Sequence, residues 1–176
     1  KVPKQKLFPI KLGFNNEKYY PTKQNKENFF LIIGRHNPHK NLERILSAFA
    51  LANPKDYKLV FVGPFDNRYT PKLLKLTNHL NIGHLCEWRG WISDHEKLVL
   101  LNQCKALIIA SLWEGFGLPA LEAMACGTLV IASNKGALSE VVADCGILID
   151  PLDKNSIASA MNKIIDDNTL VDNITK

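Results

Sequence analysis

The sequence predicts an α/β fold, a Rossmann-like doubly wound parallel sheet of about six strands with helices on both faces. Short, almost wholly apolar runs alternate with longer stretches in which apolar residues recur at helical spacing. Runs without polar alternation are typical of strands that are buried on both faces. With 176 residues, of which 46% are hydrophobic and 22% charged, the chain can form one domain around a substantial core.

Six runs are the expected strands. The first is Phe-Phe-Leu-Ile-Ile at 29–33, and the second ends at Gly63 followed by proline. The predicted strands are residues 29–33, 57–62, 86–89, 106–110, 128–132 and 146–149.

The helices are predicted from apolar spacing and from residues that start helices. Asn41 precedes an apolar stripe, Thr70 precedes Pro71 as a capping residue, and the run from Ser93 to Glu96 forms a capping box. The closing helix has apolar residues at i, i+3, i+4, i+7 and i+8. The predicted helices are residues 42–50, 70–80, 94–103, 119–126, 137–142 and 157–165.

The composition excludes several classes of protein. Apolar residues are too many for intrinsic disorder, and the longest apolar stretch, 106–113, is far shorter than the ~20 residues of a membrane span. The lysine-rich start is not followed by the apolar segment of a signal peptide. The four cysteines lie far apart, which indicates reduced thiols packed as small apolar side chains. We therefore expect a soluble, cytoplasmic protein.

The net charge of +5 lies entirely in residues 1–28. This segment holds seven lysines and two glutamates, so the remaining fifteen basic and fifteen acidic residues balance. A nucleic-acid reader would carry its basic face on the folded part, so we expect no nucleic-acid partner. Residues 1–28 do not fit the alternation and are predicted to be an interdomain linker. They are expected to be a solvated linker or an edge segment, or else a segment weakly attracted to an anionic membrane surface.

A doubly wound sheet binds ligands beyond the carboxyl ends of its strands, so the loops there decide the function. The loop after the first strand carries Arg35 and Lys40 and ends at a helix N-terminus, which suits a diphosphate. No Gly-x-Gly-x-x-Gly or Walker sequence is present. The alternative is a pair of solvated surface cations.

The loop after the fourth strand, 111–122, contains two glycines and a proline that starts a helix. The amides of Phe116, Gly117 and Leu118 are placed to bind an anion or sugar hydroxyls. Glu114 and Glu122 can each accept two hydrogen bonds from vicinal hydroxyls. The alternatives are an ordinary loop acid at 114 and, at 122, an acid favoured by the helix dipole.

These segments resemble a known family. The block 114–122 resembles the Glu-x7-Glu motif of retaining glycosyltransferases of family 4, which have two Rossmann domains in the GT-B fold. The loop Gly34-Arg35 to Lys40-Asn41 resembles that family's G-R-x-x-x-x-K-N phosphate loop. Segments 61–64, 123–127, 130–133 and 146–151 resemble further family stretches, and 12–21 resembles a diverged crossover segment.

The resemblance implies that residues 29–176 are the C-terminal nucleotide-sugar-binding domain and that 1–28 cross over from an N-terminal acceptor domain absent from this chain. The implied enzyme transfers a sugar from a UDP- or GDP-sugar to a glycan or lipid-linked acceptor. The expected setting is cell-envelope polysaccharide synthesis in the cytoplasm, at the inner face of the membrane. The fragment alone is expected to be inactive or weakly active.

The resemblance also implies roles for individual residues. The catalytic residues are Arg35 and Lys40 on the diphosphate, beside Gly34, and Glu114 on the donor sugar. Glu122 binds the ribose. The remaining substrate-binding positions are the amides of Phe116, Gly117 and Leu118 for the sugar and distal phosphate, and the segment Arg89, Gly90, Trp91 and Ile92 for the base.

We expect no cofactor and no bound metal, because fixed cations can stabilise the leaving diphosphate and no Asp-x-Asp pair occurs. Two other functions remain open: a nucleotide-sugar epimerase of the same architecture, and a non-catalytic nucleotide-binding module.

Several side chains keep two interpretations. His36 and His39 either contact phosphate or are solvated, and Trp113 either stacks on the ligand or wedges the loop onto the sheet. Residues 134–136 are candidates for lining the sugar pocket, and Glu140 is either a site residue or a helix cap.

Overall fold

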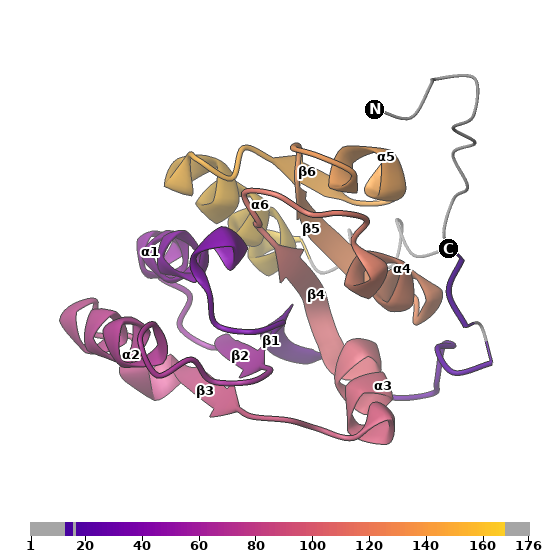
Figure 1. The fold of residues 1–176 in the computed structure, drawn as a ribbon, viewed down its shortest axis with the longest axis horizontal. Coiled ribbons are helices and arrows are strands. Elements are labelled where there is room, and N and C mark those ends of the chain that lie inside the picture. The colour runs from indigo at the N-terminus through magenta and orange to yellow at the C-terminus, as the bar shows by residue number, and fades with distance from the viewer. Residues whose placement is uncertain (1–12, 16, 168–176) are drawn as a thin grey trace, which may run out of the picture.

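The computed structural model describes residues 13–15 and 17–167, so residues 1–12 and 16 of the predicted linker and the last nine residues of the chain lie outside it. One parallel sheet confirms the predicted fold class (Figure 1). Its strands are β1 (Glu27–Ile33), β2 (Lys58–Val62), β3 (Cys86–Arg89), β4 (Cys104–Ile109), β5 (Leu129–Ser133) and β6 (Ile147–Ile149). Their order across the sheet is β3-β2-β1-β4-β5-β6.

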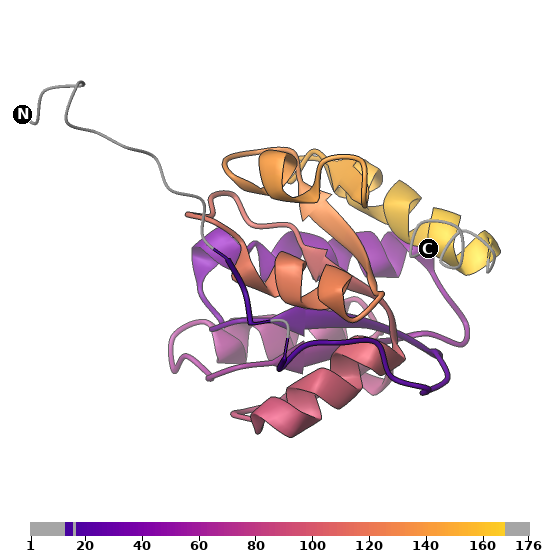
Figure 2. The ribbon, with the colours of Figure 1, turned by 90° about the vertical axis from the view of Figure 1, so that its right-hand side faces the viewer.

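Helices cover both faces of the sheet (Figures 1 and 2). One layer contains α1 (Leu42–Ala52), α2 (Thr70–His79) and α6 (Lys154–Asp166), and the other contains α3 (Asp94–Gln103), α4 (Leu118–Ala125) and α5 (Leu138–Val142). Two short 3₁₀ turns, Pro38–Lys40 and Gly83–Leu85, connect elements.

Strand β1 shows why the sequence runs are wholly apolar. Phe30 and Ile32 pack into the core beneath α1, α2 and α6, whereas Phe29 and Leu31 pack into the core beneath α3, α4 and α5. Successive side chains of a strand point to opposite faces, and here both faces are covered.

The predicted helix starts hold in one case and fail in two. Ser93 and Glu96 form the capping box of α3 as predicted. Thr70 lies inside α2, and its hydroxyl oxygen accepts a hydrogen bond from the Asp66 amide. Asn41 precedes α1 but makes no side-chain cap, because its backbone is left-handed at φ 58° and its side chain points elsewhere.

Asn41 instead joins three parts of the sheet edge. Its buried Nδ2 donates to the Ala110 carbonyl at 2.9 Å, just after β4, and to the Pro151 carbonyl at 2.7 Å, just after β6. A left-handed backbone is tolerated by asparagine better than by most residues. This side chain therefore fixes the loop after β1 against two other strand ends.

The described residues before β1 pack on the domain, in contrast to the expected solvated linker. Tyr19 is buried in the core beneath α3 and α4, and the Thr22 amide donates to Asn102 Oδ1 at 2.7 Å. Figure 2 shows this indigo segment running past α3 and α4. The sheet also begins at Glu27, two residues before the predicted boundary at 28/29.

The four cysteines are free thiols, as predicted. Burial raises the pKa of Cys104 to about 12 and that of Cys126 to about 11. Cys145 is exposed, so its prediction as a packed apolar side chain was wrong. It lies in the turn between α5 and β6, where no layer covers it.

Within the part of the chain that the structure describes, no helix combines the length and the apolar character needed to cross a bilayer.

The role of Asn41 predicts a specific cost of replacement. N41A removes donors from two carbonyls and places alanine in a left-handed conformation, so the free energy of unfolding should fall by about 2–4 kcal/mol. Asn53 is the matched control, since it is also left-handed at φ 48° but is exposed at the end of α1. N53A should cost about 1 kcal/mol. Equal losses for the two variants in urea denaturation would contradict this role.

Candidate functional site

The sheet order reverses between β1 and β4, and the loops that follow these two strands meet at its carboxyl edge. The Leu112 amide, after β4, donates to the His39 carbonyl, after β1, at 2.8 Å. In doubly wound sheets such a switch point is where ligands bind. The site is therefore built from residues 34–41 and 110–117.

A glycine lets the first loop fold back on itself. Gly34 has φ 144°, and a Cβ there would lie 3.0 Å from Lys40 Cε. The stem of Lys40 therefore lies across the position that any other side chain would occupy. This arrangement carries the Lys40 ammonium from the end of a 3₁₀ turn toward β4.

The two loops meet in a short ion pair. Lys40 Nζ lies 2.6 Å from Glu114 Oε1, and the Ser111 hydroxyl donates to the same oxygen at 2.7 Å. The Lys40 and Glu114 side chains are only 19% and 15% exposed. Both predicted site residues thus occupy one crevice, and their charges neutralise each other.

Ser111 was not assigned a role from the sequence. It is buried at the start of the loop that follows β4, three residues before Glu114. The three-residue spacing between a hydroxyl and a carboxylate was a signal for this contact in the sequence. The direction of the Ser111 side chain, however, depends on the fold.

Arg35 lies on the same loop as Lys40, and its charge is unbalanced among the described residues. The residue is exposed and forms no ion pair with any residue that the structure describes. The site thus presents one open cation and one neutralised cation.

The start of α4 supplies backbone donors to the same crevice. Gly117 precedes α4 in a left-handed conformation at φ 89°, where a Cβ would lie 2.5 Å from Leu138 Cδ2. Only glycine fits this position, and the first amides of a helix have no intrahelical acceptor. Phe116 is half-buried and Leu118 is exposed at this edge.

Glu122 belongs to a separate cluster beneath the crevice. Its Oε2 lies 2.5 Å from Lys97 Nζ of α3, and Lys97 stacks over the Tyr19 ring. Burial, and next the nearby Glu122 charge, raise the pKa of Tyr19 to about 12. No contact joins Glu122 to the Lys40–Glu114 pair among the described residues.

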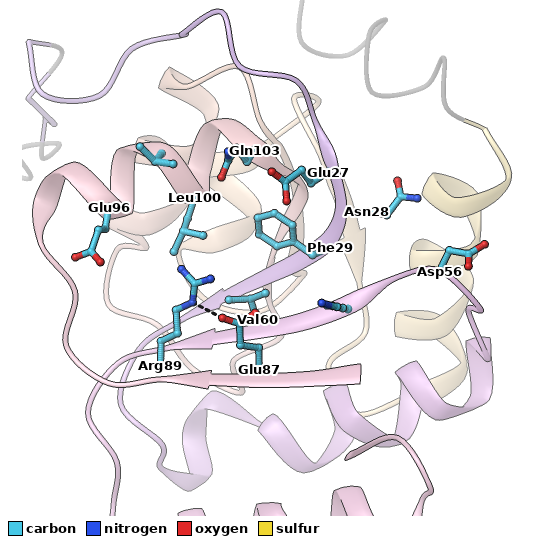
Figure 3. Close-up of a pocket in the computed structure, with 12 residues that line it drawn as sticks. Glu27, Asn28, Phe29, Asp56, Val60, Glu87, Arg89, Glu96, Leu100 and Gln103 are labelled. Carbon is cyan, nitrogen blue, oxygen red and sulfur yellow. Dashed lines mark hydrogen bonds and ion pairs between the residues drawn. The ribbon is translucent and has the colours of Figure 1, made fainter. Parts of the chain in front are cut away.

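The side chains of the predicted base-binding segment, residues 89–92, lie in different surroundings. Arg89 Nε donates to Glu87 Oε1 at 2.7 Å, and both side chains line a cavity of about 370 Å³ between α3 and strands β1–β3 (Figure 3). The side chain of Arg89 therefore points away from Lys40. Trp91 is 84% exposed, whereas Ile92 packs against the core.

The carbonyls of this segment also hold the turn after β2. The Gly63 amide donates to the carbonyls of Arg89 and Gly90, at 3.2 and 3.1 Å. Backbone contacts of residues 89–92 thus face the carboxyl edge, while the Arg89 side chain does not.

The solvated interpretation of His36 was wrong. The residue is 1% exposed, its Nδ1 lies 2.9 Å from Thr70 Oγ1, and its ring contacts Phe65 and Trp88. Burial lowers its pKa, which a weaker effect of nearby Asp66 opposes. His36 anchors the first loop to α2 and does not face the crevice.

Residues after β5 lie against the second loop. Gly136 has φ 64°, and a Cβ there would lie 3.2 Å from the Glu114 carbonyl. The neighbouring residues Asn134 and Lys135 are exposed. Their predicted role in lining the sugar pocket stays a prediction. Glu140 is exposed in the first turn of α5.

A cluster of three or more histidine, cysteine or acidic side chains arranged for a metal ion is absent from residues 13–15 and 17–167.

Comparison with known proteins identifies the family. The fold is a doubly wound parallel α/β sheet, with the Lys40–Glu114 pair at its switch point. Residues 14–176 match the family described as glycosyl transferases group 1, and the chain belongs to that family.

Two relatives are named mannosyltransferases. The MMP alpha-(1->4)-mannosyltransferase of Mycolicibacterium hassiacum is 32% identical over 94% of this chain and 41% of its own length. The O-antigen chain mannosyltransferase RfbU of Salmonella typhimurium is 30% identical over 93% of this chain and 45% of its own. The chain thus spans less than half the length of these curated relatives.

Two solved structures share the fold. The C-terminal domain of a glycosyl transferase group 1 family protein, LpcC from Francisella tularensis, is 25% identical with a TM-score of 0.82, and 93% of each chain is covered. Anabaena HepE in complex with UDP and glucose has a TM-score of 0.85 at 22% identity, over 93% of this chain and 48% of its own.

His36 makes a pH-dependent contribution to stability. Its folded pKa is lowered, so below about pH 6.5 the unfolded chain binds a proton that the folded chain does not. The free energy of unfolding should therefore fall as the pH falls from about 6.5 toward the folded pKa, by up to about 1.4 kcal/mol per pH unit.

Urea denaturation between about pH 5 and 8 measures this slope. H36L should flatten it, whereas H79Q, at an exposed histidine of α2, should leave it unchanged. A slope that persists in H36L would assign the proton to another group.

Proposed function

We propose that this chain is the donor-binding domain of a retaining family 4 glycosyltransferase with the GT-B fold. The single observation that carries the proposal is the junction of Lys40 and Glu114, beside the open cation Arg35, at the switch point of the sheet. Cations for a diphosphate and a carboxylate for sugar hydroxyls lie within one crevice. Membership of the glycosyl transferase group 1 family supports this assignment.

The donor is a nucleoside-diphosphate sugar, linked to UDP or GDP. Arg35 and Lys40 bind the diphosphate, and the amides at the start of α4 bind the distal phosphate. Glu114 accepts hydroxyls of the sugar. Glu122 binds the ribose after exchanging its partner Lys97, and the backbone of residues 89–92 contacts the base.

The chemistry requires stabilisation of the leaving group. The bond between the anomeric carbon and the diphosphate oxygen breaks, and a bond from that carbon to an acceptor oxygen forms on the same face. The acceptor proton passes to the departing phosphate oxygen. Negative charge develops on the diphosphate, and the fixed cations and helix amides lower the barrier by stabilising it.

The rest of the enzyme supplies the acceptor. The mannosyltransferase relatives are more than twice as long as the part matched here, and the LpcC domain of similar extent is described as C-terminal. We assign residues 29–176 to the donor domain and the segment before β1 to the crossover. The O-antigen relative supports a hexosyl transfer in surface polysaccharide synthesis. We propose that this transfer takes place at the inner face of the membrane.

Nucleotide binding tests the proposal directly. Isothermal titration of the chain with UDP, GDP, UDP-glucose and GDP-mannose should show binding of one nucleotide series. R35A and K40A should each weaken binding of the sugar nucleotide by about tenfold or more, because each removes a charge-assisted hydrogen bond.

K75A serves as the control, since Lys75 is an exposed cation on α2 outside the crevice. Its affinity should match that of the wild-type chain. Equal weakening by K75A would show non-specific attraction, and unchanged affinity in both crevice variants would refute the assignment.

The proposal also predicts metal independence. Because protein cations neutralise the diphosphate, adding EDTA in place of Mg²⁺ should change the affinity for the sugar nucleotide by less than about twofold. A larger loss that Mg²⁺ restores would show that the site requires a divalent ion.

A further inference from the structure

The Lys40–Glu114 ion pair carries a consequence for ligand selection that rests on the proposed function. We infer that Glu114 competes with the diphosphate for Lys40, so that the site discriminates against the bare nucleoside diphosphate in favour of the nucleotide sugar. Glu114 is thus a specificity-determining residue that also promotes release of the nucleotide product.

The first support is the distribution of bonds on the carboxylate. Lys40 and Ser111 both bind Oε1 of Glu114, at 2.6 and 2.7 Å. The structure gives Oε2 no such partner among the described residues, so this oxygen remains able to accept hydroxyls. A sugar can therefore bind Glu114 without displacing Ser111.

The second support is how closely the pair is packed. The space lined by Gly34, Lys40 and Ser111 is only about 10 Å³, at the lower limit of what one water molecule needs. Both charged side chains are largely buried, which makes their attraction stronger than that of a surface pair. A diphosphate that binds the Lys40 ammonium therefore competes with Glu114 for its charge.

A nucleoside diphosphate and a nucleotide sugar differ in the charge and the hydrogen-bond donors that they place beside Glu114. A terminal phosphate carries about one more negative charge near pH 7 than a phosphate esterified by a sugar. A bare nucleoside diphosphate therefore takes Lys40 and places extra negative charge beside a largely buried carboxylate. A nucleotide sugar brings less charge and supplies hydroxyl donors to Glu114.

The loop geometry keeps Glu114 in place during this exchange. Gly136 lies against its carbonyl, and Ser111 holds Oε1. Lys40 is the flexible partner, because its ammonium is carried on a four-carbon stem with several rotatable bonds. Arg35, which is exposed, provides the first contact for either ligand.

The test is a titration of the full chain and its E114Q variant with UDP, GDP, UDP-glucose and GDP-mannose. E114Q keeps an oxygen for Ser111 but removes the charge that holds Lys40. It should bind the nucleoside diphosphate at least about tenfold more tightly than the wild-type chain and the matching nucleotide sugar more weakly. E114D, with a shorter side chain, should give an intermediate shift.

E27Q controls for the change in net charge. Glu27 is exposed at the start of β1, at the opposite edge of the sheet from the crevice, and its variant should bind like the wild-type chain. Thermal unfolding of each variant verifies that it is folded, and E114D provides the test should E114Q fail to fold.

Each outcome is decisive. Tighter nucleoside diphosphate binding in E114Q supports the inference, including the case in which only the variant binds measurably. Unchanged or weaker binding in folded E114Q, with K40A still deleterious, overturns the inference and leaves the proposed function standing. If no nucleotide binds to the wild-type chain or to any variant, both the inference and the proposed function are overturned. If E27Q gains as much affinity for the nucleoside diphosphate as E114Q, the effect is one of net charge and the inference is overturned.

Discussion

The reversal of strand order between β1 and β4 is the constraint on which the site depends. The helices that follow these neighbouring strands lie on opposite faces of the sheet, and the two loops between strand and helix meet at its carboxyl edge. Asn41 then ties the first loop to the ends of β4 and β6. The backbone of Leu112 and His39 joins the two loops a second time.

Charge is arranged within this crevice so that little of it is uncompensated. Lys40 and Glu114 neutralise each other at short range, and Ser111 orients the carboxylate. Arg35 remains open to solvent, where its charge attracts an anion without a desolvation cost.

The segment before β1 connects to the site through a second cluster. Tyr19 packs beneath α3 and α4, where Lys97 contacts both its ring and Glu122. The residues proposed as a crossover therefore lie next to the residue proposed for the ribose. A change in this segment can reach Glu122 without passing through the crevice loops.

The sequence by itself determined the fold class, the order of strands and helices and the capping box at Ser93, because apolar periodicity and helix caps follow from local chemistry. It also placed Lys40 and Glu114 on loops at one edge of the sheet, where the structure pairs them, while their roles stay predictions. Only the tertiary structure decided that Asn41 bridges strands, that His36 is buried, that Ser111 orients Glu114, and that Glu122 pairs with Lys97. These contacts join residues distant in the chain or depend on side-chain direction, and local spacing cannot specify either.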